Sequence, residues 1–335
     1  MTSKWLHRTP NFNEPILLGY EKGTGEPVRV PVWHLVINGQ SGLSGKTTTL
    51  KSLALRSTHP FLIFDVKTEA DWDQPKPQQY LKPFLSTSVE PVMLKELLEA
   101  SGHMGLKREF AVLVRLCEQA KTLEDVHKAC LLRLGAPKLH PVERDMLTTL
   151  EYLLRRLLKE MEGVDFERHR LPLGEGRNVM NLGQFSKELQ QLIIASTIEE
   201  LFKHHRDVIV VIDEAHRFMP ENASSAAKDA VRRLLKEGRS RGLWGWLSDQ
   251  SIIEIEKPPL RQAGVWILGT QSEKHEVTRA VEQLPKRPKV PVEQVMNLPL
   301  GYFFVAIKRP DGTELRTVYA QPYWCSSEAA IEAAK

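Results

Sequence analysis

Short apolar runs alternate with longer segments of helical periodicity along most of this chain. The short runs have the length of buried strands, while the longer segments carry apolar residues three and four positions apart. This alternation is typical of an α/β fold in which crossover helices join the strands of a mostly parallel sheet. We expect strands at 33–38, 61–65, 178–182, 208–213, 243–248, 265–268, 302–307 and 314–319, and helices at 46–56, 186–204 and 226–237.

One long segment breaks this alternation. Between Pro91 and Gly163 no convincing strand pattern occurs, and apolar residues from Met146 to Met161 recur at helical spacing, with Gly163 as the stop. We predict a helical insertion whose leucine stripe packs internally, because the stripe is shorter than the three heptads that would favour a coiled coil. The expected organisation is a lead-in at 1–30, a core at 31–75 and 170–320, the helical insertion at 76–169 and a C-terminal tail at 321–335.

Composition places the chain among ordinary globular proteins. Its 335 residues are 41% hydrophobic and 26% charged, and it has no long apolar run and no signal-like N-terminal block, so we expect no membrane insertion and no secretion. The three cysteines are not spaced for a disulfide framework or a zinc site, which favours a reducing cytoplasm. The net charge of +4 is a weak indication of a polyanionic partner, and residues 225–241 carry six basic side chains against two acidic ones.

A glycine-rich segment follows the first predicted strand. Glycines at a strand-to-helix turn let backbone amides converge on phosphate oxygens, and the helix N-terminus adds partial positive charge. We therefore predict that this segment binds ATP, with Lys46 on the β- and γ-phosphates and the Thr47 hydroxyl on Mg²⁺. The predicted binding residues are Gly39, Ser41, Gly42, Ser44, Gly45, Lys46, Thr47 and Thr48.

The first glycine of this loop is displaced. The pattern GxxxxGK[ST] requires glycine at position 40, where this chain has Gln40, and the nearest glycine is Gly39. Two explanations stay open at this point. Either the loop is one residue longer than usual, or Gln40 replaces the first glycine.

A second apolar run ends in two acids. Residues 208–212 are all valine or isoleucine, and Asp213 and Glu214 follow them. We predict that Asp213 holds Mg²⁺ and that Glu214 is the general base for the attacking water. Residues 213–216 also spell Asp-Glu-Ala-His, the box of helicases with two tandem motor domains, but too few residues follow for a second motor domain. We therefore interpret His216 as a structural or coupling residue.

Several motifs together resemble the FtsK and HerA group of P-loop ATPases, and HerA-type ATPases most closely. The likeness covers about residues 16–320 apart from the insertion, and HerA proteins usually begin with a small β-barrel for which the lead-in is too short. It rests on residues 16–39 before the phosphate loop, on Asp65-Val66-Lys67-Thr68-Glu69, and on Glu237-Gly238-Arg239 followed by a strand and Asp249-Gln250-Ser251.

This resemblance implies a RecA-like P-loop NTPase core that hydrolyses ATP with Mg²⁺, assembles as a homo-hexamer and translocates duplex DNA without sequence preference. It also implies that Gln250 senses the γ-phosphate and that Arg239, or failing that Arg241, reaches the site of a neighbouring subunit. An arginine in that position would neutralise charge on the transferring phosphoryl group. For Asp65 and Glu69, polar support of the site and a surface position are equally open.

Other functions stay open at this stage. One is a nucleotide-gated oligomeric scaffold that regulates a partner nuclease or another effector, and another is a monomeric P-loop NTPase that acts on a small molecule. DNA contacts by Arg232 and Arg233 are a weaker hypothesis, as is a basic loop at 286–289. Trp244 and Trp246 alternate on a predicted central strand, so we expect them in the core rather than on a base-stacking surface.

Overall fold

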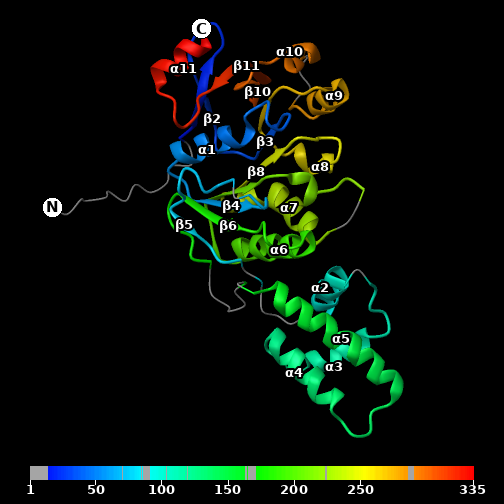
Figure 1. Cartoon of the computed structure of the whole chain (residues 1–335). Coiled ribbons are helices and arrows are strands. Elements are labelled where there is room, and N and C mark those ends of the chain that lie inside the picture. Colours follow the sequence, from blue (N-terminus) through cyan, green and yellow to red (C-terminus); the bar gives the residue numbers. More distant parts are fainter. Residues whose placement is uncertain are drawn as a thin grey trace, which may run out of the picture.

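The structure, a computed structural model, describes residues 14–69, 71–83, 85, 91–102, 104–118, 120–162, 164, 171–222, 225–285 and 290–335. Its strands are β1 (Ile16–Glu21), β2 (Pro27–Val30), β3 (Leu35–Asn38), β4 (Phe61–Asp65), β5 (Gln79–Tyr80), β6 (Arg177–Asn181), β7 (Val208–Ile212), β8 (Leu243–Asp249), β9 (Val265–Leu268), β10 (Tyr302–Lys308) and β11 (Thr313–Ala320). They form one sheet in the order β2-β1-β11-β10-β9-β3-β8-β7-β4-β6-β5 (Figure 1). The strands from β9 to β5 are parallel, and β10, β11, β1 and β2 extend the sheet by antiparallel pairing.

Helices cover both faces of this sheet. Because successive strand residues point to opposite faces, Leu35 and Ile37 of β3 pack in one apolar cluster with Leu50 and Leu53, while Val36 belongs to a second cluster on the other face. The helices are α1 (Lys46–Arg56), α2 (Pro91–Gly102), α3 (Phe110–Cys117), α4 (Leu123–Leu134), α5 (Pro141–Glu160), α6 (Lys187–His204), α7 (Ala226–Glu237), α8 (Lys257–Leu260), α9 (Lys274–Glu282), α10 (Val292–Met296) and α11 (Ser327–Ala334), with short 3₁₀ turns η1 (Ala215–Arg217) and η2 (Gly238–Arg241).

Helices α2 to α5 gather at one end of the molecule, beside the helix α6 (Figure 1). The leucines of α5 at positions 147, 150, 153, 154 and 157 are buried, so the stripe packs internally as predicted. The helix ends at Glu160, and the predicted stop at Gly163 lies outside the described residues. The apolar cluster of these helices continues into α6, since Leu94 and Leu189 belong to the same core.

The predicted α/β class, with a mostly parallel sheet and a helical insertion, is confirmed. Each predicted strand occurs within two residues of its expected bounds. Three strands were not expected: β1 and β2 in the lead-in, and β5, whose two residues are too few for a periodic signal. The C-terminal helix α11 packs its Ala330 and Ala334 against Tyr20 of β1. Within the described ranges, no helix has both the length and the apolar character needed to cross a bilayer.

Candidate nucleotide-binding and catalytic site

The order of the sheet brings four strand ends to one edge. β8 lies between β3 and β7, β4 follows β7, and all four strands are parallel. Residues that follow these strands therefore meet at the carboxyl edge, where open α/β sheets bind ligands. The phosphate loop follows β3, Asp213 and Glu214 follow β7, and Lys67 follows β4 shortly after Asp65.

The predicted ATP-binding residues lie in one loop and the first helical turn. Gly42 and Gly45 have left-handed φ values of 74° and 82°, a region that favours glycine. Gly45 is the N-cap of α1, and Lys46 and Thr47 are the first two helical residues. The free amides of this helix end therefore face the loop, as an anion site requires.

Neighbouring atoms leave no room for a side chain at position 39 of this loop, so glycine is required there. A Cβ atom at Gly39 would lie 2.7 Å from Ser44 Oγ and 3.2 Å from the Cα of Gly269. Gln40 lies outside the left-handed φ region, its amide donates to the Thr270 carbonyl at 2.8 Å, and its own carbonyl accepts from Ser44 Oγ at 2.8 Å. This geometry favours a loop that is one residue longer than usual, with the first glycine at position 39.

The ammonium of Lys46 turns back into the loop. Its Nζ donates to the Gly39 carbonyl, and the side chain is buried. Burial lowers the pKa of Lys46, and the charges of Asp213, Glu214 and Asp249 oppose that shift. The lysine of the phosphate loop is thus in electrostatic contact with acids from β7 and β8.

Lys67 is a shared cation for the two acids after β7. Its Nζ lies 3.5 Å from Asp213 Oδ2 and 3.5 Å from Glu214 Oε1, and 2.7 Å from Asp71 Oδ2. Burial, followed by the charge of Asp213, raises the pKa of Glu214, which makes this carboxylate more basic than an exposed one. The sequence motif containing Lys67 did not indicate this contact, although parallel pairing of β4 with β7 could have.

The residues present fit a magnesium ion held together with phosphate oxygens. Asp213 is a buried carboxylate and Thr47 is a half-buried hydroxyl, both hard oxygen donors. In the part of the chain that the structure describes, no cluster of three or more histidine, cysteine or acidic side chains could hold a metal alone. Mg²⁺ commonly binds through one or two protein groups plus substrate phosphates, so Thr47 and Asp213 could serve as its protein ligands.

A buried polar network that the sequence did not predict surrounds the end of β8. Asn38 Nδ2 donates to the Asp249 carbonyl at 3.2 Å, and Gln271 Nε2 donates to Asn38 Oδ1 at 3.0 Å and to the Gln250 carbonyl at 2.8 Å. The Asp249 carboxylate also accepts from His216. The side chain of Gln250, the predicted γ-phosphate sensor, is exposed next to this network.

Arg239 and Arg241 lie at the opposite, amino edge of the sheet. Both belong to η2, directly before β8, and Arg239 is close enough to His34, which precedes β3, to lower the pKa of that imidazole. Arg241 Nη1 donates to the Phe202 carbonyl, whereas the Arg239 side chain is exposed. The whole length of β3 separates Arg239 from the phosphate loop of its own chain.

The basic residues of α7 are largely neutralised within the chain. Arg232 pairs with Glu256 at 3.0 Å, and Arg233 pairs with Glu199 at 2.6 Å and Glu237 at 3.1 Å. These pairs disfavour the hypothesis that the two arginines face DNA. The other suggested basic loop, with Lys286, Arg287 and Lys289, lies outside the described residues.

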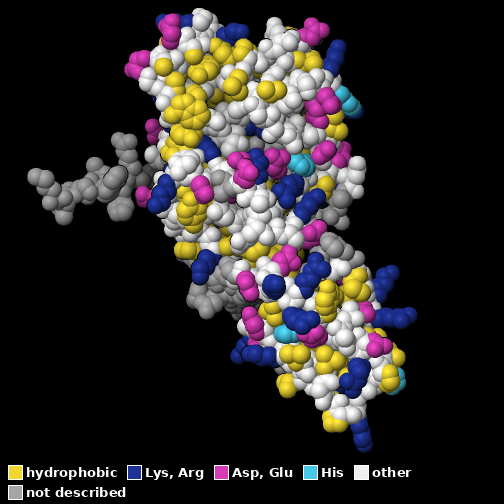
Figure 2. Space-filling view, in the orientation of Figure 1, with side chains coloured by type: hydrophobic (Ala, Val, Ile, Leu, Met, Phe, Trp, Pro, Cys, Tyr) yellow, Lys and Arg dark blue, Asp and Glu magenta, His cyan; other side chains and the backbone are white. Residues whose placement is uncertain are grey.

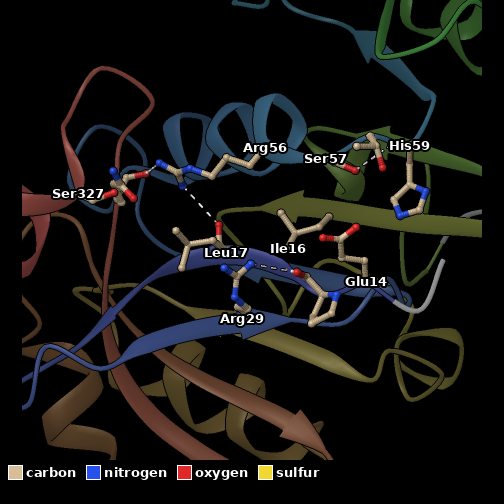
Figure 3. Close-up of a pocket in the computed structure, with 11 residues that line it drawn as sticks. Glu14, Ile16, Leu17, Arg29, Arg56, Ser57, His59 and Ser327 are labelled. Carbon is tan, nitrogen blue, oxygen red and sulfur yellow. Dashed lines mark hydrogen bonds between the residues drawn. The ribbon is translucent and has the colours of Figure 1, made fainter. Parts of the chain in front are cut away.

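A separate pocket of about 330 Å³ lies at the far end of α1 from the phosphate loop (Figure 3). Arg56 extends from the helix end and donates to the carbonyls of Leu17 at 3.4 Å and Gln321 at 2.8 Å. The guanidinium therefore ties α1 to β1 and to the segment before α11, which is a structural role.

Comparisons with known proteins agree with this fold. No protein-family model matches the sequence, and no curated protein matches it. VirB4 of Thermoanaerobacter pseudethanolicus is similar in structure, with a TM-score of 0.67 and 14% identity over 94% of this chain and 98% of that one. The genome packaging NTPase B204 from Sulfolobus turreted icosahedral virus 2 gives only 0.44 at 12% identity, over 85% and 96% of the two chains. At such identities the likeness to VirB4 shows a common fold, and this fold agrees with the predicted RecA-like core.

Proposed function

We propose that this protein is a Mg²⁺-dependent ATPase that forms a ring, a homo-hexamer, and uses hydrolysis to translocate double-stranded DNA. One observation carries the chemistry: Lys46 of the phosphate loop and the acids Asp213 and Glu214, which follow β7, lie at one sheet edge and within electrostatic reach of each other. Two of these groups have pKa values displaced by burial, as is common for groups that act on charged substrates.

In this mechanism the amides of the loop and Lys46 bind the β- and γ-phosphates. Thr47 and Asp213 would hold Mg²⁺, which supplies positive charge to the phosphate oxygens when bound. Glu214 accepts the proton of the attacking water, and its raised pKa suits that role. Lys67 holds Glu214 and Asp213 in place through their shared ion pair. Gln250 senses the γ-phosphate.

Ring formation and DNA translocation rest on Arg239 and on the motif resemblance. Because Arg239 lies at the amino edge, it can reach a nucleotide bound at a phosphate loop only in another copy. Such an arginine activates hydrolysis only after subunits assemble. The Glu-Gly-Arg, strand, Gln sequence around it is the part of the resemblance that supports a DNA partner.

A nucleotide-gated scaffold for a nuclease or another effector is the second candidate. It is favoured by exposed apolar side chains on α4 and α5, where Leu132 is 80% and Val142 is 53% exposed. Hydrophobic side chains are visible on the surface of this helical group in Figure 2. Such side chains on a projecting group of helices suit a protein partner.

The deciding experiment is ATP hydrolysis by the purified protein with and without linear duplex DNA. The variant Glu214→Gln is the blank, since it keeps the shape of the side chain and removes the base. If DNA stimulates ATP hydrolysis by the unmodified protein but not by the variant, the result supports the motor function. Hydrolysis at the same rate with and without DNA supports the scaffold or a small-molecule NTPase. If Glu214→Gln hydrolyses ATP as fast as the unmodified protein in both conditions, the assigned site is wrong.

A further inference from the structure

A second hollow lies at the amino edge of the sheet, beyond the start of β3. Its volume is about 270 Å³, and the residues that line it include Trp33, His34, Arg239, Trp244, Gln262 and Lys308. They come from the segment before β3, from η2 and β8, from the turn after α8 and from the end of β10. The hollow is therefore separate from the phosphate loop, which follows the other end of β3.

The charged side chains around this hollow are all cationic. No carboxylate lines it among the described residues, while Arg239, Lys308 and Arg309 do. Arg309 is paired with Glu314 at 2.6 Å. Neither Arg239 nor Lys308 forms an ion pair with any residue that the structure describes. Both side chains are exposed at this hollow, so their charges are available to an anionic ligand.

Two buried N–H groups beside the hollow also lack acceptors. Nδ1 of His34 accepts a hydrogen bond from the Gly245 amide at 3.0 Å, so Nε2 carries the hydrogen of the neutral ring. Burial and the charge of Arg239 lower the pKa of His34 to about 4, which keeps the ring neutral at pH 7. Within the part of the chain that the structure describes, His34 Nε2 and Trp244 Nε1 are buried without a hydrogen-bond partner, and the whole His34 residue is only 4% exposed. Because both nitrogens are closed to solvent, a ligand in the hollow would contact the cations and the accessible indole surfaces rather than these donors.

The walls of the hollow add an aromatic surface. Trp33 and Trp244 are only partly buried, in contrast to Trp246, which is fully buried as expected. Trp244 packs against the core cluster, as expected, and also has a surface-accessible part. Indole faces next to cations are suited to stacking on a nucleobase whose phosphate meets those cations.

We propose that this hollow binds a nucleoside phosphate, either a free nucleotide or a nucleotide unit of a DNA strand. Lys308 and Arg239 contact the phosphate, and the indoles of Trp33 and Trp244 contact the base. The inference goes beyond the proposed hydrolysis, with which it shares only Arg239, and its DNA alternative rests on the proposed DNA partner. A ligand in the hollow would bind the Arg239 guanidinium, which in the proposed ring acts on the nucleotide of the neighbouring subunit.

Gln262 allows a clean test because it is exposed, lines the hollow and has no part in the proposed hydrolysis. The change Gln262→Glu adds a negative charge at nearly constant shape, and Gln294→Glu, on the exposed side of α10, is the matched control. Both are made in the Lys46→Ala protein, which lacks the phosphate-loop lysine. The probes are a fluorescent trinitrophenyl analogue of ATP and a dye-labelled single-stranded oligothymidylate, and the readouts are fluorescence and anisotropy.

We expect Gln262→Glu to weaken binding of at least one probe about tenfold relative to Gln294→Glu, the size of effect that a like charge near a phosphate produces. Loss confined to the ATP analogue identifies a free nucleotide as the ligand, and loss confined to the oligonucleotide identifies DNA. Equal affinities of the two variants for both probes, or no binding by folded Lys46→Ala protein, would overturn the proposal. If Gln262→Glu shows the expected loss of binding while the unmodified protein hydrolyses no ATP, the proposed ligand site in the hollow is supported and the proposed ATPase function is wrong.

Discussion

His216 Nδ1 lies 3.0 Å from the Oδ2 atom of Asp249, and the His216 amide donates to the same oxygen at 2.5 Å. Asp249 is 1% exposed at the end of β8, while His216 belongs to η1, directly after the two acids of β7. The contact therefore links the acid segment to the strand next to the phosphate-loop strand. This agrees with the interpretation of His216 as a structural or coupling residue.

Replacing His216 with alanine should destabilise the protein by about 1 to 3 kcal/mol, because a buried carboxylate loses its side-chain donor. The hydrogen bond to Asp249 raises the pKa of His216 above its usual 6.5. The pair therefore contributes fully below about pH 6.5, and its contribution is lost as the pH rises through the raised folded-state pKa. Urea unfolding of His216→Ala, Asp249→Asn and the double variant should give a coupling energy that is larger at pH 6 than at pH 9. Zero coupling at pH 6 would contradict this role.

Lys46→Ala should abolish ATP hydrolysis, since no other described cation donates into the phosphate loop. The measurement is phosphate release at saturating ATP. Lys121→Ala, at an exposed position before α4, is the control and should retain full activity. Undiminished turnover in Lys46→Ala would exclude the assigned nucleotide site.

Gly39→Ala and Gln40→Gly should behave in opposite ways. The methyl group of Gly39→Ala meets Ser44 and the backbone of Gly269, so nucleotide binding should fall at least about tenfold as the loop shifts. Gln40→Gly restores the usual pattern but loses no contact that needs a side chain, so its affinity should stay within about twofold. Titration with a fluorescent ADP distinguishes the two variants. The reverse order of affinities would show that Gln40 occupies the position of the first glycine.

Arg239→Ala should bind ATP normally at its own phosphate loop and lose most of its hydrolysis, by about 10³-fold or more if the arginine acts in a neighbouring site. Mixing Arg239→Ala with Lys46→Ala, both inactive alone, should restore part of the activity because some interfaces then combine an intact loop with an intact arginine. Arg241→Ala is the comparison, since Arg241 binds the Phe202 carbonyl and its loss should mainly affect stability. Inactive mixtures would argue against catalysis between subunits.

Asp65→Asn should stabilise the nucleotide-free protein at neutral pH. Burial raises the pKa of Asp65 from 3.8 to about 6, and the Trp72 amide, which donates at 3.0 Å, opposes the shift. A raised carboxyl pKa favours the folded state below pH 3.8, and this advantage is lost as the pH rises through about 6. The variant should therefore gain about 2 kcal/mol on wild type between pH 4 and pH 7.5. Asp311→Asn, in an exposed turn, should show no such pH dependence in thermal unfolding.

The parallel core could be predicted from the sequence because its strands are buried on both faces. The five residues of β4 are all buried and form an unbroken apolar run up to Asp65, so their bounds are predicted to the residue. β5 has only two residues and is held in the sheet by pairing with β6. No local sequence pattern indicates this pairing. The strands β1 and β2 are also held by tertiary pairing, with β11 and with each other.

The chemistry of the site was predictable where neighbouring residues carry it. Lys46 and Thr47 lie in one motif, and Asp213 and Glu214 end one strand. The network around Asp249 was not predictable, because Asn38 and Asp249 are 211 residues apart and meet only through the register of β3 with β8. The predicted roles of Gln250 and Arg239 stay predictions.

The pairing of early strands with late ones also determines when the protein can fold during synthesis. β3 pairs with β8 and β9, and β1 pairs with β11, so the earliest strands to leave the ribosome wait for partners made near the end of translation. Until then their apolar edges need protection from other chains, and such long-range pairing makes folding slow. Helices α2 to α5, whose contacts are close in sequence, can form in the meantime. A truncation before β8 would therefore release a folded helical group joined to an unpaired, aggregation-prone phosphate-loop strand.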